Sequence, residues 1–352
     1  MWLWPVLSAV ACAVPFIMPN PAAPEARDGR AVDITGKTVI ITGANSGVGF
    51  AVAKELVRRG ANVIMACRSS ARGEQARQAI IDALQDTVPT ASKQVTVAIL
   101  DVGRLASVHE FAKKYEQDHP HRKIDLLYLN AGIAGIGRND PTLTPEGFEA
   151  FYATNFLGHF LLLYLLHSRL AEDARVISTS SFGGIIASFS KTFSTTTVKG
   201  QVEGGFHFAP RVKPMPTGSN ESGYAQTKAM QVLMTRALNQ RIAANGSRRI
   251  ALAYHPGLVS TNIFAVAKEA GWFTFLTFLT LCNWLLGISP EVAARTPVFL
   301  GTATEAALAQ RGDRSKIWER SKSYSSIFDK PAVERFWQRW CADADITADW
   351  SL

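Results

Sequence analysis

The stretch TGANSGVG, residues 42–49, decides the fold of this chain, because it joins a short β-branched run to a helical stretch. The β-branched run before it is Thr38–Ile41. A glycine-rich turn from a strand into a helix lets backbone N–H groups meet a pyrophosphate at the helix N-terminus. We expect Gly43 to permit the tight turn, Gly47 to let the ligand approach, and Gly49 to let helix and strand pack closely.

Strands and helices alternate along most of the chain. After Thr38–Ile41, the sequence predicts strands at Asn62–Cys67, Val95–Leu100, Ile124–Leu129, Arg175–Thr179 and Ile250–Tyr254, and a helix at Tyr224–Ala244. Apolar strands that alternate with helices form a parallel sheet covered on both faces. We therefore predict the α/β class, with a doubly wound parallel sheet in a single domain over residues 36–352.

Three segments interrupt this alternation. Residues 1–35 contain an uncharged apolar run of 17 residues, Trp2–Met18, followed by a Pro/Ala-rich linker. A run of this length barely spans a bilayer, so a membrane anchor is favoured while a cleaved signal peptide and a transit peptide stay open. A Gly/Ser/Thr/Pro-rich insertion covers 183–222. The apolar segment 262–289 is either a buried core helix or, as we favour, a substrate-site flap that rests on a membrane.

The composition fits one large globular domain with a basic excess. Hydrophobic residues make up 47% of the 352 residues and charged residues 19%, which allows a sizeable core. The net charge is +8, but the basic residues are scattered and are not interleaved with aromatics, which argues against a nucleic-acid partner. An anionic membrane and a dinucleotide phosphate explain the charge more simply. The four cysteines form no CxxC pair, so neither a metal site nor a disulfide framework is predicted.

The end of the second predicted strand indicates which dinucleotide is bound. A carboxylate at this position would bind a ribose 2′-hydroxyl and select NAD, but the sequence here is Ala66-Cys67-Arg68. A guanidinium pairs well with a 2′-phosphate, so Arg68 favours NADP(H) over NAD(H). Asp101 is either an adenine ligand or an ordinary turn aspartate. The other predicted cofactor-binding residues are Gly43, Asn45, Ser46, Gly47, Val48 and Gly49 in the turn, Val102, Asn130, Ala131 and Gly132 after later strands, and Tyr224 and Lys228.

Tyr224 and Lys228 are predicted to carry the proton chemistry, because residues i and i+4 share one face of a helix. A phenol has an unperturbed pKa of about 10, which is too high for easy proton transfer at neutral pH. A lysine ammonium one turn away should favour the phenolate and lower this pKa. Ser181, with Ser180 as its rival, would hold a substrate carbonyl. Asn155, in the middle of a predicted helix, would hold a water that links Lys228 to solvent.

The stretch after the sixth predicted strand completes the expected site. Its backbone, at Pro256, Gly257 and Val259, and the Thr261 side chain are expected to grip the nicotinamide carboxamide. His159 is expected to be a packed helix histidine rather than a catalytic base.

These motifs stand in the order found in the short-chain dehydrogenase/reductase superfamily, which the chain resembles over roughly Lys37 to Ala309. The resemblance implies a Rossmann fold and a catalytic tetrad of Asn155, Ser181, Tyr224 and Lys228. Within the superfamily, the chain is most similar to membrane-associated retinol dehydrogenases. The stretches that carry this similarity are ACR at 66–68, NFLGHF at 155–160 and HPG at 255–257, while YLNAG at 128–132 is similar to 3-keto-steroid reductase.

Two departures from the superfamily pattern concern the substrate and the cofactor loop. Leu129 stands where many members have the first Asn of NNAG, and the 183–222 insertion is much longer than the superfamily minimum. The identity of the substrate is therefore not carried over from the resemblance.

Motifs and resemblance together predict an NADP(H)-dependent oxidoreductase that interconverts a carbonyl and an alcohol on a retinoid, a sterol or a long-chain carbonyl. A non-catalytic NADP(H)-binding scaffold or redox sensor is the alternative. We expect membrane association at the endoplasmic reticulum with the catalytic domain facing the cytosol. Arg27 and Arg30 follow the apolar run, and a glycan on Asn220 would crowd Tyr224. The direction of catalysis and the number of subunits, a homo-oligomer included, stay open.

Overall fold

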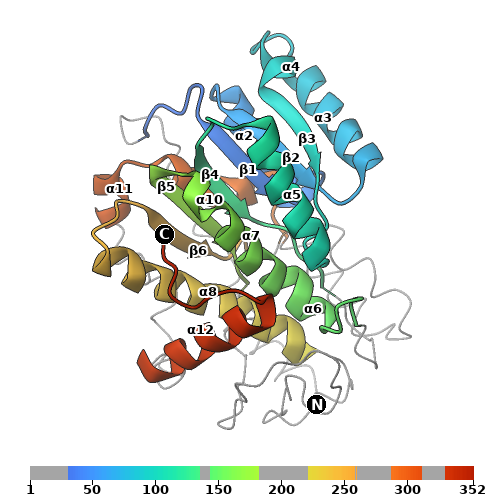
Figure 1. The fold of residues 1–352 in the computed structure, drawn as a ribbon. Helices are drawn as coiled ribbons and strands as arrows, with labels where there is room; N and C mark the ends of the chain where they lie inside the picture. Colours follow the sequence, from blue (N-terminus) through green and yellow to red (C-terminus); the bar gives the residue numbers. More distant parts are fainter. Residues whose placement is uncertain (1–30, 135–142, 182–220, 258, 260–286, 311–329) are drawn as a thin grey trace, which may run out of the picture.

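The computed structural model describes residues 31–134, 143–181, 221–257, 259, 287–310 and 330–352 (Figure 1). The predicted 1–35 segment, the 183–222 insertion and the 262–289 flap lie mostly outside these ranges, and Thr261 lies outside them. Within the described ranges, no helix combines the length and the hydropathy that a membrane span requires.

The described part of the chain forms a six-stranded parallel sheet with the strand order β3-β2-β1-β4-β5-β6. The strands are β1 Thr38–Thr42, β2 Asn62–Cys67, β3 Val95–Ile99, β4 Ile124–Leu129, β5 Leu170–Thr179 and β6 Ile250–Tyr254. The order reverses between β1 and β4, and such a reversal opens a ligand-binding crevice at the carboxyl ends of the strands. The predicted doubly wound Rossmann-type sheet is thereby confirmed.

Helices cover both faces of this sheet (Figure 1). One apolar core contains residues of α2 Gly47–Arg58, α3 Ser70–Leu84, α4 Ala91–Gln94, α10 Pro290–Thr302 and α11 Glu305–Gln310. The other contains residues of α5 Leu105–Asp118, α6 Ala150–Tyr152, the π-helix η1 Ala153–Leu157, α7 Gly158–Leu166, α8 Glu221–Ala244 and α12 Lys330–Ala344, and the 3₁₀ turn η2 His167–Arg169 follows α7. Successive side chains of β1 point to opposite faces of the sheet, so Val39 and Ile41 lie in the first core and Ile40 lies in the second.

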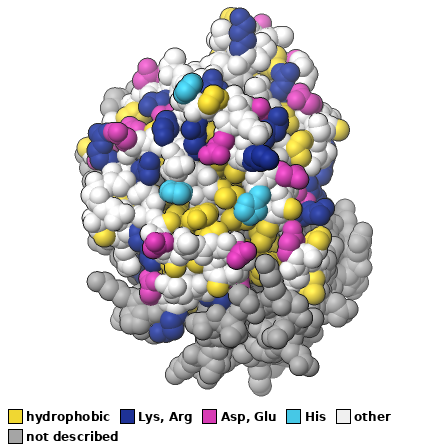
Figure 2. All heavy atoms as spheres, viewed as in Figure 1, with side chains coloured by type: hydrophobic (Ala, Val, Ile, Leu, Met, Phe, Trp, Pro, Cys, Tyr) yellow, Lys and Arg dark blue, Asp and Glu magenta, His cyan; other side chains and the backbone are white. Residues whose placement is uncertain are grey.

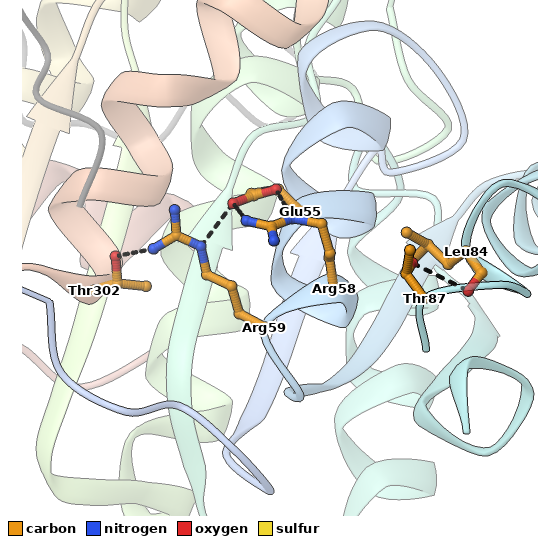
Figure 3. Close-up of polar contacts among 6 residues, drawn as sticks. All are labelled: Glu55, Arg58, Arg59, Leu84, Thr87 and Thr302. Atoms are coloured by element: carbon orange, nitrogen blue, oxygen red, sulfur yellow. Dashed lines mark hydrogen bonds and ion pairs between the residues drawn. The ribbon is translucent and has the colours of Figure 1, made fainter. Parts of the chain in front are cut away.

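Polar contacts at the end of α2 join it to α10 on the first face (Figure 3). Glu55 accepts hydrogen bonds from the guanidinium groups of Arg58 and Arg59, at N···O distances of 2.7 Å. Arg59 also donates from Nη1 to Thr302 Oγ1 in α10 at 3.3 Å. These contacts fix the helix that begins at the glycine-rich turn.

The second face is closed by the C-terminal helix α12, which the sequence analysis did not predict. Its Trp337 and Trp340 are fully buried. The ring centroid of Trp340 lies 4.6 Å from that of Phe156, and Trp337 meets the edge of Phe160 at 5.2 Å. This aromatic cluster presses α12 against the helix that carries Asn155.

A buried ion pair adds a polar link to the same contact. Asp343 and Arg339 of α12 are joined at 2.8 Å, with almost no exposed side-chain area. Tyr152 Oη, immediately before η1, donates to the same carboxylate oxygen of Asp343 at 2.8 Å. The C-terminal segment is therefore attached to the α6–η1 junction by directional as well as apolar contacts.

Charges on the visible surface are mixed. On the face shown in Figure 2, Lys and Arg side chains are interspersed with Asp and Glu, and apolar side chains show between them. The described residues contain no cluster of His, Cys, Asp and Glu that could hold a metal ion.

Candidate active site

The glycine-rich turn lies at the carboxyl end of β1, beside the point where the strand order reverses. Gly43 and Gly47 adopt positive φ angles of 67° and 57°, a backbone conformation that side chains disfavour. Helix α2 begins at Gly47, and its first turn contains no acidic side chain and receives no hydrogen bond from the Ser46 side chain. Its first N–H groups are thus oriented toward a ligand, as a dinucleotide phosphate requires.

Gly49 is where α2 comes closest to the end of β4. A Cβ atom at this position would lie 2.5 Å from Asn130 Nδ2 and 2.6 Å from the carbonyl oxygen of Gly43. Neither contact distance is sterically allowed, and one of the two atoms belongs to the backbone. Only glycine fits here without moving the cofactor turn.

Thr42 ties the ends of β1 and β4 together. Its hydroxyl accepts hydrogen bonds from the amides of Asn130 and Ala131, both at 2.9 Å, while Asn130 Nδ2 donates back to the Thr42 carbonyl at 2.9 Å. The predicted Asn130-Ala131-Gly132 segment is thereby held against the glycine-rich turn. The sequence motif predicted no role for Thr42, although Thr42 directly follows the predicted strand Thr38–Ile41.

His159 is a buried neutral histidine that continues this network. Its Nε2 lies 2.9 Å from Thr42 Oγ1 and its Nδ1 lies 3.4 Å from the Asn155 carbonyl. The same Thr42 hydroxyl also lies 3.3 Å from the Tyr128 carbonyl, which accepts from it. Burial lowers the pKa of His159 to about 3. The ring is a structural connector, in line with the packed histidine expected from the sequence.

Asn155 lies in the π-helix η1, fully buried between the end of β4 and α8. Its Oδ1 accepts from the Ile133 amide at 2.7 Å, and its Nδ2 donates to the Ile133 carbonyl at 3.0 Å and to Thr227 Oγ1 at 3.2 Å. Both N–H donors of the amide are therefore used by protein groups. The side chain thus clamps the segment after β4, and the water expected at Asn155 stays a prediction.

The structure brings Ser181, Tyr224 and Lys228 together at the carboxyl end of β5. A hydrogen bond joins Ser181 to Tyr224, and Lys228 Nζ lies 5.7 Å from the centroid of the Tyr224 ring. Ser180 is engaged elsewhere, since its hydroxyl donates to the Lys228 carbonyl at 2.6 Å. Lys228 Nζ in turn donates to the Thr179 carbonyl at 2.9 Å.

Burial sets the protonation of the two titratable groups. It lowers the pKa of Lys228 to about 8, since an ammonium loses solvation inside the protein. Burial also raises the pKa of Tyr224, against the opposite effect of the Ser181 hydrogen bond. The expected lowering of the Tyr224 pKa by the lysine is therefore not the net direction found. Desolvation of the phenolate outweighs the contacts that favour it.

The remaining predicted cofactor residues follow the ends of parallel strands. Arg68 is exposed after β2, and Val102 is buried after β3. Asp101 Oδ1 accepts a hydrogen bond from the Gly103 amide at 3.0 Å, which is an ordinary turn contact. Pro256 and Gly257 follow β6, and Val259 pairs with Ile288 in an isolated bridge. Asn45, Ser46 and Val48 lie in the turn and the first turn of α2. The residues named here other than Thr261 thus follow strand ends or begin α2, and the glycines and the first amides of α2 fit a dinucleotide.

Comparisons with known proteins agree with this geometry. The model of the short chain dehydrogenase family matches residues 37–197. Retinol dehydrogenase 13 from Homo sapiens is 34% identical over 276 residues, which cover 78% of this chain and 74% of the human protein. The chain belongs to the short-chain dehydrogenase family. Retinol dehydrogenase 12 from Mus musculus, 32% identical with 88% and 87% of the two chains covered, supports a place in the retinol dehydrogenase branch.

Solved structures support the same fold for this short-chain dehydrogenase. A protein from Mycobacterium Paratuberculosis superposes with a TM-score of 0.62 at 26% identity, over 92% of this chain and 98% of that one. A 3-ketoacyl-(acyl-carrier-protein) reductase from Brucella melitensis, complexed with NADH, has a TM-score of 0.54 at 21% identity and covers 78% and 94% of the two chains, which shows the fold alone. As a family member, the chain is an oxidoreductase that interconverts carbonyl and alcohol groups with a nicotinamide cofactor.

Proposed function

We propose that this chain is an NADP(H)-dependent dehydrogenase/reductase that acts on a lipophilic carbonyl or alcohol. The observation that carries the proposal is the Ser181–Tyr224 hydrogen bond beside Lys228, at the edge of the sheet where the glycine-rich turn lies. Two hydroxyl groups this close together can both form hydrogen bonds to one substrate oxygen.

The proposed mechanism assigns one task to each side chain. The bound nicotinamide supplies a hydride to the substrate carbon in reduction and removes one in oxidation. In reduction, Ser181 donates a hydrogen bond to the carbonyl oxygen, and Tyr224 Oη transfers its proton to that oxygen. The Lys228 ammonium then stabilises the phenolate and, with a pKa of about 8, exchanges protons near neutral pH. The Asn155 amide holds the segment after β4 in place beside them.

The choice of NADP(H) rests on the end of β2. Ala66 and Cys67 are buried there and carry no carboxylate, and Arg68, the next residue, is exposed. An exposed guanidinium at this place is available to a 2′-phosphate, whereas a carboxylate would repel one. Arg68→Ala should lower kcat/KM for NADPH at least roughly tenfold and leave kcat/KM for NADH nearly unchanged.

The lipophilic substrate and the membrane rest on the sequence and on the relatives. Several similar proteins are named retinol dehydrogenases, and the chain contains the apolar segments 1–35 and 262–289. We propose an association with the endoplasmic reticulum membrane, with the catalytic domain on the cytosolic side. The same proposal divides the chain into an N-terminal segment, 1–35, and one catalytic domain, 36–352. This domain includes the 183–222 insertion and the 262–289 flap.

The test is cofactor oxidation across retinals, 3-keto-sterols and medium-chain aldehydes, with NADPH and NADH compared for wild type and Tyr224→Phe. We expect NADPH-dependent turnover of one lipophilic class and a loss of about 10³-fold or more in the variant. NADPH binding, followed by its fluorescence, should be retained. Tight NADPH binding without turnover of any carbonyl would contradict the proposal and favour a cofactor-binding scaffold.

A further inference from the structure

The main-chain carbonyl of Asn155 is covered by side chains of two helices. Gln231 Nε2 in α8 donates to it at 2.6 Å, and His159 Nδ1 approaches it at 3.4 Å. With the amide side chain also engaged, the Asn155 carbonyl keeps its second lone pair for the water that was expected to link Lys228 to solvent. A water at this carbonyl would lie beside the Gln231 side chain.

Gln231 offers a second acceptor for such a water. Its side chain is 1% exposed, and its Oε1 atom accepts no hydrogen bond from any residue that the structure describes. A buried amide oxygen without a partner is costly, and such sites commonly bind an internal water. Tyr224, Lys228 and Gln231 also follow one another at i, i+4 and i+7, so they share one face of α8.

The geometry points to Gln231 as a positioning residue for proton resupply, which rests on the proposed function. Its Nε2 fixes the Asn155 carbonyl, and its Oε1 holds a water next to Lys228. In each reduction Tyr224 gives its proton to the substrate oxygen, and the Lys228 ammonium returns one proton to the phenolate. The water held by Gln231 restores the ammonium and is itself restored from solvent. No further oxidant or reductant is needed.

The experiment compares wild type with Gln231→Met and Gln231→Glu. Methionine keeps the length of the side chain but removes both amide atoms, whereas glutamate restores an acceptor oxygen. Thr235→Val is the matched control, because Thr235 is buried one turn further along α8 and its hydroxyl donates to the Gln231 carbonyl. Steady-state kinetics, solvent deuterium isotope effects and added imidazole are measured for each protein. Amide hydrogen exchange of residues 150–160 is followed without substrate.

We expect kcat of Gln231→Met to fall roughly tenfold or more, with the NADPH dissociation constant unchanged within about twofold. Its solvent isotope effect should rise, and imidazole should restore much of the rate, since a small buffer replaces the missing proton donor. Gln231→Glu should retain more activity than Gln231→Met. Hydrogen exchange around Asn155 should increase in Gln231→Met and stay at the wild-type level in Thr235→Val.

Three results would overturn the inference. If the wild type is active and Gln231→Met is equally active, Gln231 has no role in proton supply. A slow Gln231→Met that imidazole does not rescue leaves Gln231 as a structural clamp without a part in proton supply. If the wild type turns over no carbonyl, the proposed function fails instead, and unchanged hydrogen exchange in Gln231→Met would then refute the positioning contact independently.

Discussion

The two faces of the sheet are stabilised by different kinds of side chain. The face under α2 and α10 is filled mainly by aliphatic residues and is joined at its rim by the Glu55 and Arg59 contacts of Figure 3. The face under α7, α8 and α12 contains a cluster of aromatic rings among its apolar residues, and the buried Arg339–Asp343 pair. The first face holds the cofactor turn and depends on local motifs. The second holds the proton-transfer residues and depends on contacts between distant segments.

The largest expected effect is on the aromatic face. Trp340→Ala should reduce the free energy of unfolding by about 4 kcal/mol, because a fully buried indole leaves a cavity between α12 and Phe156. Urea unfolding followed by far-UV circular dichroism measures this loss. Ile80→Val on the opposite face is the comparison, with an expected loss of about 1 kcal/mol. Equal losses for the two variants would show that both faces are equally adaptable.

The next effect concerns Lys228, whose pKa is lowered to about 8 from 10.5. The unfolded chain binds this proton up to about pH 10.5 while the folded one releases it near pH 8, so stability rises with pH between these values. One pKa unit is about 1.4 kcal/mol, so wild type should gain on the order of 3 kcal/mol relative to Lys228→Met across this window. Urea titrations of both proteins at several pH values measure the difference. A difference that stays constant with pH would mean that the folded protein retains the ammonium.

A smaller effect is expected at Gly49, where α2 comes closest to the end of β4. Gly49→Ala puts a Cβ 2.6 Å from the Gly43 carbonyl, and overpacking of this kind costs about 2 kcal/mol. Because the displaced group is the cofactor turn, the KM for the dinucleotide should rise about tenfold or more. Ala51→Gly, in the same helix, is the control: it should lower the melting temperature slightly and leave the KM for the dinucleotide unchanged. A normal KM in Gly49→Ala would show that the turn moves without harm to cofactor binding.

The smallest effect is expected at the rim of the first face. The Arg58–Glu55 pair is largely exposed on its arginine side, and exposed pairs contribute about 0.5 kcal/mol or less. Thermal unfolding of Arg58→Ala should therefore lie within about 2 °C of wild type. Arg59→Ala also loses the contact with Thr302 in α10 and should be the more destabilised of the two. The reverse order would mean that the rim contact between α2 and α10 is unimportant.

The sequence predicted the sheet closely because each strand is an apolar run that a turn residue closes. The observed β2, β4 and β6 have the predicted boundaries, whereas β5 begins at Leu170 rather than Arg175. Glu172 and Asp173 are exposed near the start of β5 and interrupt its apolar pattern. Strand ends also placed the glycine-rich turn and Ser181 at one edge, since parallel strands end together, and the i, i+4 spacing placed Tyr224 next to Lys228 in α8.

The contacts around Asn155 were not predictable in the same way. Gln231 is an ordinary amide in a helix, and nothing in its neighbours indicates a partner in another helix. The spacing of Val333, Phe336, Trp337 and Trp340 would have predicted an amphipathic helix, but not that it packs on Phe156. The raised pKa of Tyr224 likewise depends on burial, which the spacing of Tyr224 and Lys228 does not describe.

The π-helix η1 has a consequence for how this domain tolerates change. A π-turn holds one residue more than an α-helical turn, so it offsets the angular phase of α7 from that of α6 by about 100°. This offset lets one continuous rod present Asn155 to the end of β4 and Phe156 and Phe160 to α12. Deleting a single residue within 153–157 would restore regular α-helical pairing and leave the later side chains of α7 where they are, because the wide turn already absorbs the extra residue. The packing of α7 on α12 should therefore survive such a deletion, whereas the contacts of Asn155 with the segment after β4 should not.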